Sequence, residues 1–375
     1  IAIEASAVIL CTGGAMRMYR YTTAPEELTG DGLAAAYRAG AELMDMEFPM
    51  FLPYILIKPD AVNSIDFPYL LSAYLDAKAL NRMGQEYMVK WDRMRLAQST
   101  RDVNAIAQMM EVLEGRGSPN DGTYLSLKHI PKNILDRSSD WLPKMIGRWR
   151  YGAFKMKDFL PDLSQDAIEC APACHFWTGG IKINEHCETN LPGLYAAGEG
   201  TGGVHGANRV SGNALTMTQV WGPRAGEAAA KFVKDQGRVE PDVEQAKELK
   251  EKILAPLNRK SGTSPIEIRK ETRRLSHLYL NAVRDGKNLE ETLLRVEELK
   301  EQEKTVFTKN PNLLQYNMEW IEALQTENLL SIMEMVGKAS LLREESRGAM
   351  FRRDFNDTDG VNWLKNIIIY QESDQ

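Results

Sequence analysis

The segment 198–215, GEGTGGVHGANRVSGNAL, constrains the fold more than any other part of the sequence, because six of its residues are glycine. It also holds one acid, one arginine and one histidine. Glycine packs little and loses much conformational freedom on folding, so such a run indicates a backbone pressed against something flat or charged. A plain glycine-rich loop is the alternative, and we favour a ligand-binding loop.

A second glycine turn lies near the start of the sequence. Residues 1–10 are mostly apolar and run into Cys11-Thr12-Gly13-Gly14, which predicts a buried strand ending in a turn that a ligand could approach. Residues 29–32, Thr-Gly-Asp-Gly, then predict a turn and cap before an alanine-rich helix. The order is strand, glycine turn, helix.

The rest of the chain changes character several times. Residues 46–162 contain several prolines and many methionines without a regular α/β rhythm, whereas the glycine-rich style returns from Leu163. Beyond Asp235 apolar residues recur every three or four positions in charged segments, which predicts a helical bundle. The run NWLKNIIIY near the end predicts a final strand. We therefore expect an α/β first domain in two parts, 1–45 and 163–234, with an inserted second domain at 46–162. A helical domain, 235–340, and a C-terminal segment, 341–375, follow.

Composition excludes several classes of protein. Of 375 residues, 43% are hydrophobic and 26% charged, and the net charge of -6 is mild, so a nucleic-acid binder is not expected. No apolar run approaches the roughly 20 residues of a membrane-spanning helix, and no signal peptide is recognisable. We therefore expect a soluble, cytoplasmic protein, which partner subunits could attach to a membrane. Because Ile1 opens directly on a strand pattern, the sequence is expected to begin partway through a domain.

The four cysteines show no paired metal-binding spacing and fit a reducing compartment. Cys170 and Cys174 with His175 could ligate a metal, but we favour a buried thiol pair and expect no metal site.

Several segments together resemble one family. LYAAGE, HGANR and GNAL are similar to the motif with which the flavoproteins of fumarate reductase, succinate dehydrogenase and aspartate oxidase hold FAD. The glycine turn and helix of 7–43, the segment TRDVNAIAQMMEVLEGRG, the strand CHFWTGGIKIN and the C-terminal ESRGAMFRRDF also resemble parts of that family in the same order. The resemblance implies an FAD-dependent oxidoreductase with an inserted α+β capping domain and a C-terminal helical bundle.

The resemblance also implies the cofactor contacts. Glu199 corresponds to a glutamate that accepts hydrogen bonds from hydroxyls of the flavin's ribityl or ribose, although it could instead cap the next helix. The remaining implied contacts lie in the glycine turns and at the start of that helix, and they are Gly13, Gly14, Asp31, Arg209, Asn213, Ala214 and Leu215. The family's N-terminal dinucleotide fingerprint is not in this sequence, so we expect these residues alone to bind FAD poorly.

For catalysis, the resemblance implies three residues. His175 and Arg209 correspond to a pair that holds one substrate carboxylate, for which a bidentate guanidinium is well suited. Arg101 corresponds to the arginine that gives a proton to the substrate carbon next to the one that receives hydride. The alternatives are a core histidine for His175 and a salt bridge with Asp102 for Arg101.

The other carboxylate clamp of the family is not recognisable. Leu52 stands where the family has a histidine, and no Thr-Glu pair follows it. A leucine cannot hydrogen-bond an anion, so the far end of the substrate is expected to be apolar or differently polar.

The expected function is therefore flavin-dependent reduction of a carbon-carbon double bond beside a carboxylate, or the reverse oxidation. An iron-sulfur electron-transfer subunit is a possible partner. The charged helical domain and tail could form a docking surface for it, although a charge-rich helix is more often a solvated face. Three alternatives stay open: a relative of the adenylylsulfate reductase flavoprotein, an amino-acid oxidase like aspartate oxidase, and a flavoprotein-fold scaffold that has lost catalysis.

Overall fold

The computed structural model describes residues 3–137, 161–236 and 242–371. The chain divides into two compact units, each with its own sheets and core. Unit 1 consists of Ile1–Arg20, Ala24–Met50 and Phe176–Gln375, and unit 2 consists of Tyr21–Thr23 and Phe51–His175. Two strands, β3 (Pro49–Leu56) and β6 (Ile168–Trp177), carry the chain from one unit to the other.

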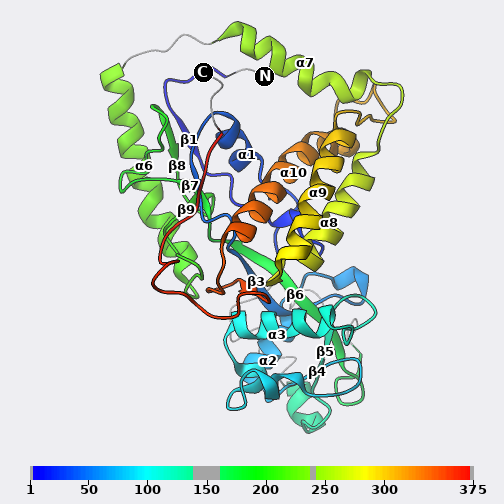
Figure 1. Ribbon diagram of the computed structural model, residues 1–375. Helices are drawn as coiled ribbons and strands as arrows, with labels where there is room; N and C mark the ends of the chain where they lie inside the picture. The colour runs from blue at the N-terminus through cyan, green and yellow to red at the C-terminus, as the bar shows by residue number, and fades with distance from the viewer. Residues whose placement is uncertain (1–2, 138–160, 237–241, 372–375) are drawn as a thin grey trace. The chain divides into compact units, whose positions relative to one another are not determined.

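Unit 1 contains a parallel strand pair with one long helix packed against it. Strand β1 (Val8–Leu10) pairs with β8 (Leu194–Ala196), and α6 (Asn213–Gln236) packs against both (Figure 1). The prediction of a buried strand was wrong for Val8 and Ile9, which are 46% and 38% exposed. Neither residue belongs to the apolar cluster that α6 closes, which instead includes Tyr195 from β8.

Unit 1 contains further short strands and a helix. A four-stranded sheet has the order β12-β2-β7-β9, and it contains two residues of the expected C-terminal strand. The glycine turn at 29–32 is followed by α1, as the sequence predicts. These elements are β2 (Leu43–Met44), β7 (Gly180–Lys182), β9 (Thr201–Gly202), β12 (Ile368–Ile369), α1 (Asp31–Arg38) and the short helix η1 (Met16–Met18).

The expected helical bundle is present. Helix α10 packs along α9 and α8, and the three lie side by side in Figure 1. Asp285 and Asn317 cap two of the helices, since each side chain accepts a hydrogen bond of 3.0 Å from the backbone N–H three residues on. The elements are α7 (Val243–Asn258), α8 (Pro265–Tyr279), α9 (Gly286–Glu303) and α10 (Met318–Leu342), with a parallel pair of β10 (Val283–Arg284) and β11 (Phe351–Arg352).

Unit 2 is an α+β unit. Its sheet has the order β3-β6-β5-β4, in which β5 pairs antiparallel with both β4 and β6. Apolar side chains from the sheet and from the helices form one core with Tyr54, Leu71 and Tyr87 among its buried members. The remaining elements are β4 (Lys78–Leu80), β5 (Thr123–Ser126), α2 (Phe67–Tyr74), α3 (Arg101–Leu113), η2 (Asp60–Val62), η3 (Tyr87–Lys90) and η4 (Leu96–Gln98).

Within the described ranges, no helix combines the length and the apolar character that crossing a bilayer requires. The boundaries of the predicted domains and of the C-terminal segment stay a prediction.

Candidate functional site

Two glycine turns of unit 1 approach each other at the carboxyl ends of β1 and β8. A side chain on Gly200 would place its Cβ 3.2 Å from the carbonyl oxygen of Gly13. A Cβ on Gly14 would lie only 2.5 Å from Cβ of Trp177. Glycine is therefore needed where these segments touch, and ligands of α/β folds commonly bind at the carboxyl ends of parallel strands.

Glu199 lies three residues beyond the end of β8 and is partly buried. Its Oε1 accepts a hydrogen bond of 2.9 Å from the backbone N–H of Trp177. Burial raises the pKa of Glu199 to about 7, although the bond from Trp177 and the positive charge of Arg209 act in the opposite direction. The carboxyl group can therefore change its protonation state near neutral pH.

Arg209 belongs to the same unit and is 6% exposed. Its guanidinium carbon lies 4.3 Å from the centre of the Phe176 ring, a distance typical of a cation-π contact. His205 packs edge-on against the same ring, with the ring centres 5.2 Å apart. Burial and the nearby Arg209 lower the pKa of His205, which keeps its imidazole neutral at neutral pH.

The glycine-rich segment leaves open space along its backbone. Among the described residues, no heavy atom comes within 4 Å of a Cβ placed on Gly206 or Gly212. Leu215, in the first turn of α6, is 77% exposed. Two buried nitrogens, Nε1 of Trp177 and Nε2 of His205, have no hydrogen-bond partner in the part of the chain that the structure describes. Bare backbone, an exposed apolar side chain and unpaired polar nitrogens suit a flat cofactor with polar edges.

Asp31 begins α1, where an acidic residue stabilises the helix. Its two carboxylate oxygens accept hydrogen bonds from the hydroxyl of Thr29 at 2.9 Å and from Nδ2 of Asn328 at 2.6 Å. Gly32 fits against Thr12, whose Oγ1 would lie 1.9 Å from a Cβ on Gly32. These contacts join the turn before α1 to the turn after β1. A contact between Asp31 and a cofactor stays a prediction.

His175 lies in unit 2, near the end of β6. Its Nδ1 is 2.7 Å from the hydroxyl oxygen of Thr23, and the two share a hydrogen bond. The backbone of Thr23 is tied to the same strand, since its N–H donates to the carbonyl of Cys174 over 3.1 Å. The imidazole ring is thus held in one orientation by the segment that pairs with β6.

Arg101 is the first residue of α3 and is partly buried. Burial raises the pKa of the Tyr69 hydroxyl, and the positive charge of Arg101 opposes that rise. The two groups are therefore electrostatic neighbours.

Leu52 is 4% exposed in β3 and packs in an apolar cluster with Ile55 and Ala173. Tyr69 packs against the same cluster. The position at which the family has a clamp histidine is therefore occupied here by the core side chain of Leu52.

The cysteines agree with the expected buried thiol pair. Cys170 and Cys174 are both fully buried and not disulfide-bonded, and burial raises the pKa of the Cys170 thiol. Across 3–137, 161–236 and 242–371, no group of three or more histidine, cysteine or acidic residues could hold a metal ion.

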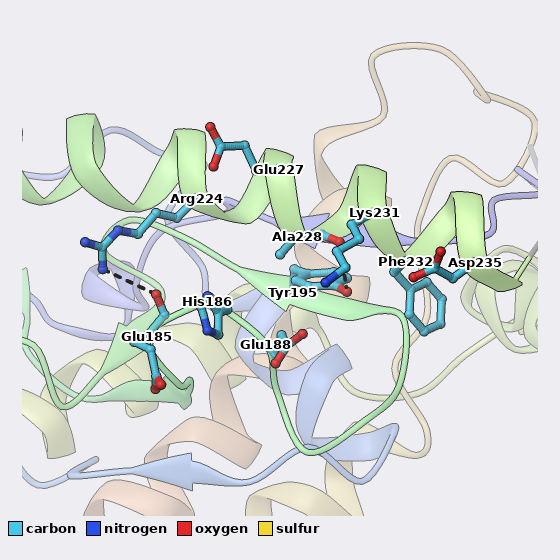
Figure 2. A pocket seen from close by; sticks show the side chains of 10 residues that line it. All are labelled: Glu185, His186, Glu188, Tyr195, Arg224, Glu227, Ala228, Lys231, Phe232 and Asp235. Carbon is cyan, nitrogen blue, oxygen red and sulfur yellow. Dashed lines mark hydrogen bonds between the residues drawn. The ribbon is translucent and has the colours of Figure 1, made fainter.

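Two cavities contain none of the predicted site residues. Figure 2 shows the larger one, of about 840 Å³, where two side chains of α6 face the rest of the lining: Arg224 faces Glu185, and Lys231 lies beside Tyr195. Its lining combines four carboxylates with two cations and one histidine, so its charge does not select an anion. The second cavity, of about 680 Å³, is lined by α7, α9 and α10.

The structure thus places the predicted residues in two groups. The glycines Gly13 and Gly14, Asp31, Glu199, Arg209 and the start of α6 at Asn213, Ala214 and Leu215 lie in unit 1, while Arg101 and His175 lie in unit 2. Phe176, Trp177 and His205 are not among the site residues that the sequence predicts. All three stand inside the quoted motifs, so only the geometry shows that Phe176 contacts Arg209 and His205. It also shows that Trp177 bonds to Glu199.

Comparison with known proteins gives two family matches. The FAD binding domain matches residues 1–215, and the fumarate reductase flavoprotein C-terminal domain matches residues 269–375. The chain belongs to the FAD-binding fumarate reductase flavoprotein family. The predicted family and cofactor, FAD, are confirmed, and so is the fold class, an FAD-binding domain with a C-terminal helical domain.

Relatives in this family cover nearly the whole chain. An uncharacterized FAD-dependent oxidoreductase of Methanocaldococcus jannaschii is 36% identical over 98% of this chain and 64% of its own length. One subunit of the CoM/CoB fumarate reductase of Methanothermobacter marburgensis is 35% identical with the same coverage. The FrdA protein of E. coli quinol fumarate reductase superposes with a TM-score of 0.83 at 26% identity, over 98% of this chain and 64% of FrdA. The chain therefore spans about 64% of the length of these relatives.

Proposed function

We propose that the protein containing this chain transfers a hydride between FAD and a carbon-carbon double bond next to a carboxylate. The observation that carries the proposal is the buried guanidinium of Arg209, stacked 4.3 Å above Phe176 in the unit that contains the glycine turns. A planar guanidinium with a fixed orientation can bind a carboxylate through two parallel hydrogen bonds. The names of relatives at about 35% identity, which include a fumarate reductase subunit, support the same class of substrate.

Each residue has a separate role in this proposal. Bound reduced FAD supplies the hydride. Arg209 and His175 bind the carboxylate of the substrate, and the bond of His175 to Thr23 fixes the ring for that task. Arg101 donates the proton to the carbon next to the one that receives hydride, and a proton relay must restore its charge because the free guanidinium is a very weak acid.

The far end of the substrate is proposed to carry no second carboxylate. Leu52 lies in the apolar cluster with Ile55 and Ala173, so its side chain offers no hydrogen bond to an anion. A carboxylate brought against such a surface would lose its hydration without gaining a partner. The proposed substrate class is therefore a monocarboxylic enoate.

Anaerobic reoxidation of the reduced, full-length protein tests the proposal. We expect a monocarboxylic enoate to reoxidise the flavin rapidly, and we expect Arg101→Gln to lose that reaction. Arg93→Gln, which changes an exposed arginine of the same unit, should react like the unmodified protein. Equal or faster reoxidation by fumarate would overturn the proposal for the far end of the substrate. No reoxidation by either class of acid would overturn the proposed function.

We also propose that the electrons come from an iron-sulfur partner subunit. The names of several relatives describe them as subunits, which supports a complex. Among the described residues, no group of three or more histidine, cysteine or acidic residues could hold a metal ion, so the relay would have to lie outside these residues. Purification of the native complex and spectroscopy of its iron test this: a complex without iron would contradict it.

A further inference from the structure

We infer that Asn104 is a positioning residue that holds Arg101 in place for proton donation. The inference rests on the proposed function, in which Arg101 is the proton donor. Its evidence is a buried hydrogen-bond network within unit 2 that closes on the backbone immediately before Arg101.

The amide group of Asn104 ties the start of α3 to the preceding segment. Its Nδ2 donates toward three carbonyl oxygens, those of Ala97 at 3.2 Å, Ser99 at 2.9 Å and Thr100 at 3.2 Å. Asn104 is 1% exposed, so water does not compete for these bonds. Thr100, the N-cap of α3, makes no capping bond with its own side chain to the described chain. The amide of Asn104 therefore fixes the chain up to the residue before Arg101.

Tyr54 holds the other side of the same amide. The hydroxyl of Tyr54 donates to Oδ1 of Asn104 over 2.7 Å, and Tyr54 is fully buried. Burial raises the pKa of Tyr54 well above its usual range, so the hydroxyl keeps the proton that it donates. Both functional atoms of the Asn104 amide are thus used, and neither can turn without breaking bonds.

A second contact fixes Tyr54 itself. Its backbone has a φ of 57°, in the left-handed region that tyrosine rarely adopts. Its N–H donates to Oε1 of Gln108 over 3.0 Å, and Nε2 of Gln108 donates to the hydroxyl of Thr123 over 2.9 Å. Strained backbone persists only where the surroundings over-determine it, and such places are common at functional sites.

The contacts explain why an asparagine would matter at this position. An arginine acts as a proton donor only when its guanidinium is set precisely against the accepting carbon and its relay, and a shift of about 1 Å can cost about 100-fold in rate. Asn104 lies one helical turn from Arg101 and bonds the carbonyl of the residue before it. Loss of the amide would release that carbonyl together with those of Ala97 and Ser99.

The test compares Asn104→Ala with a matched change at the other end of α3. Glu111 is equally buried on α3 and bonds to Asn81 at 2.9 Å and to Arg116 at 2.6 Å, away from the segment before Arg101. In the full-length protein, we expect Asn104→Ala to lower kcat for enoate reduction about 10- to 100-fold while KM stays within about 2-fold. Its solvent deuterium isotope effect should rise, because proton transfer becomes slower. Glu111→Gln should change none of the three quantities, kcat, KM and the isotope effect, even if it lowers the melting temperature as much as Asn104→Ala does.

Amide hydrogen exchange supplies a readout that does not depend on activity. Exchange in 97–103 should rise in Asn104→Ala and not in Glu111→Gln. Tyr54→Phe removes one hydroxyl only, so it should change kcat, the isotope effect and the exchange in the same direction but by less. It replaces Asn104→Ala in the test if that variant does not fold. Loss of activity in Arg101→Gln combined with unchanged kcat and isotope effect in Asn104→Ala and Tyr54→Phe would overturn the positioning role alone. Full activity of Arg101→Gln would overturn the proposed proton donor and this inference with it.

Discussion

The backbone N–H of Trp177 donates to Oε1 of Glu199 over 2.9 Å, which links the end of β6 to the turn after β8. The turn after β1 meets the same place, since a Cβ on Gly14 would lie 2.5 Å from Cβ of Trp177 and 3.3 Å from Oε1 of Glu199. Three segments that are distant in sequence thus converge on one partly buried carboxyl group. A change in the protonation of Glu199 should therefore change the stability of the folded chain, which can be measured.

The first prediction concerns stability against pH. The pKa of Glu199 is about 7 in the folded chain against an ordinary value of 4.5, so the folded state binds this proton more tightly. A raised pKa contributes stability that is fully present below the unfolded value and is lost as pH rises through the folded value. We expect the unfolding free energy of the protein without cofactor to fall between about pH 4.5 and 7, by up to about 3 kcal/mol from this group.

Glu199→Gln should remove that part of the pH dependence. Glu47, whose pKa burial also raises to about 7, stays in both proteins and cancels in the comparison. Chemical unfolding at a series of pH values measures the difference. Parallel curves for the variant and the unmodified protein would show that Glu199 has an ordinary pKa in the folded chain.

Gly14→Ala should damage the cofactor site. The added methyl group would overlap Trp177, whose side chain is fully buried and cannot move aside at low cost. We expect about 1–3 kcal/mol of destabilisation and loss of bound flavin on gel filtration. Gly226→Ala is the control, because a Cβ there meets nothing within 4 Å among the described residues, in the middle of α6. That change should be neutral or stabilise by up to about 1 kcal/mol.

Arg209→Lys should weaken carboxylate binding. An ammonium group keeps the charge but loses the planar contact with Phe176 and the two parallel hydrogen bonds. We expect the Kd of a saturated, unreactive monocarboxylate to rise roughly 10- to 100-fold, followed by the absorbance of oxidised flavin. Arg224→Lys is the matched control, since Arg224 stacks on Trp221 at 5.0 Å and lines a different cavity. An equal loss in both variants would show that the weaker binding does not come from the planar guanidinium at Arg209.

The sequence predicts the local elements of this chain well where one physical signal dominates. The regular apolar spacing beyond Asp235 gives α8 and α9, and the turn at 29–32 precedes α1 as expected. Burial is harder to predict, because it depends on what packs from elsewhere. Val8 and Ile9 have the apolar pattern of a buried strand, yet they lie outside the cluster that α6 closes and are partly exposed.

The candidate site, too, can be predicted from the sequence only in part. A backbone position with a positive φ or a close neighbour favours glycine, so it can be recognised in the sequence. Gly13, with a φ of 73°, and Gly198, with a φ of 82°, are examples. The network of Tyr54, Asn104 and Gln108 cannot be recognised in this way, because these three polar residues of β3 and α3 meet only in the folded unit. Hydrogen-bond partners that are far apart in sequence cannot be read from residue types alone.

The last prediction concerns Arg343, which is 1% exposed and ties the C-terminal segment to the rest of unit 1. Its guanidinium bonds Glu47 at 2.7 Å and Glu345 at 2.9 Å, and its carbon lies 5.0 Å from the Phe48 ring and 5.5 Å from the Trp363 ring. Arg343→Met keeps most of the volume but leaves the buried carboxylate of Glu47 without its cation, whereas Glu345 keeps its ion pair with Arg347 at 2.6 Å. We expect a loss of about 3–5 kcal/mol in unfolding free energy at neutral pH.

The loss should shrink at lower pH, where Glu47 becomes protonated and needs no cation, because its pKa is about 7. Arg295→Met is the control: Arg295 is 37% exposed and pairs with Glu298 on the surface of α9, so its removal should cost no more than about 0.5 kcal/mol. Urea unfolding of both variants at two pH values measures these differences. A cost for Arg343→Met as small as that of the surface pair would mean that Glu47 is already neutral in the folded protein.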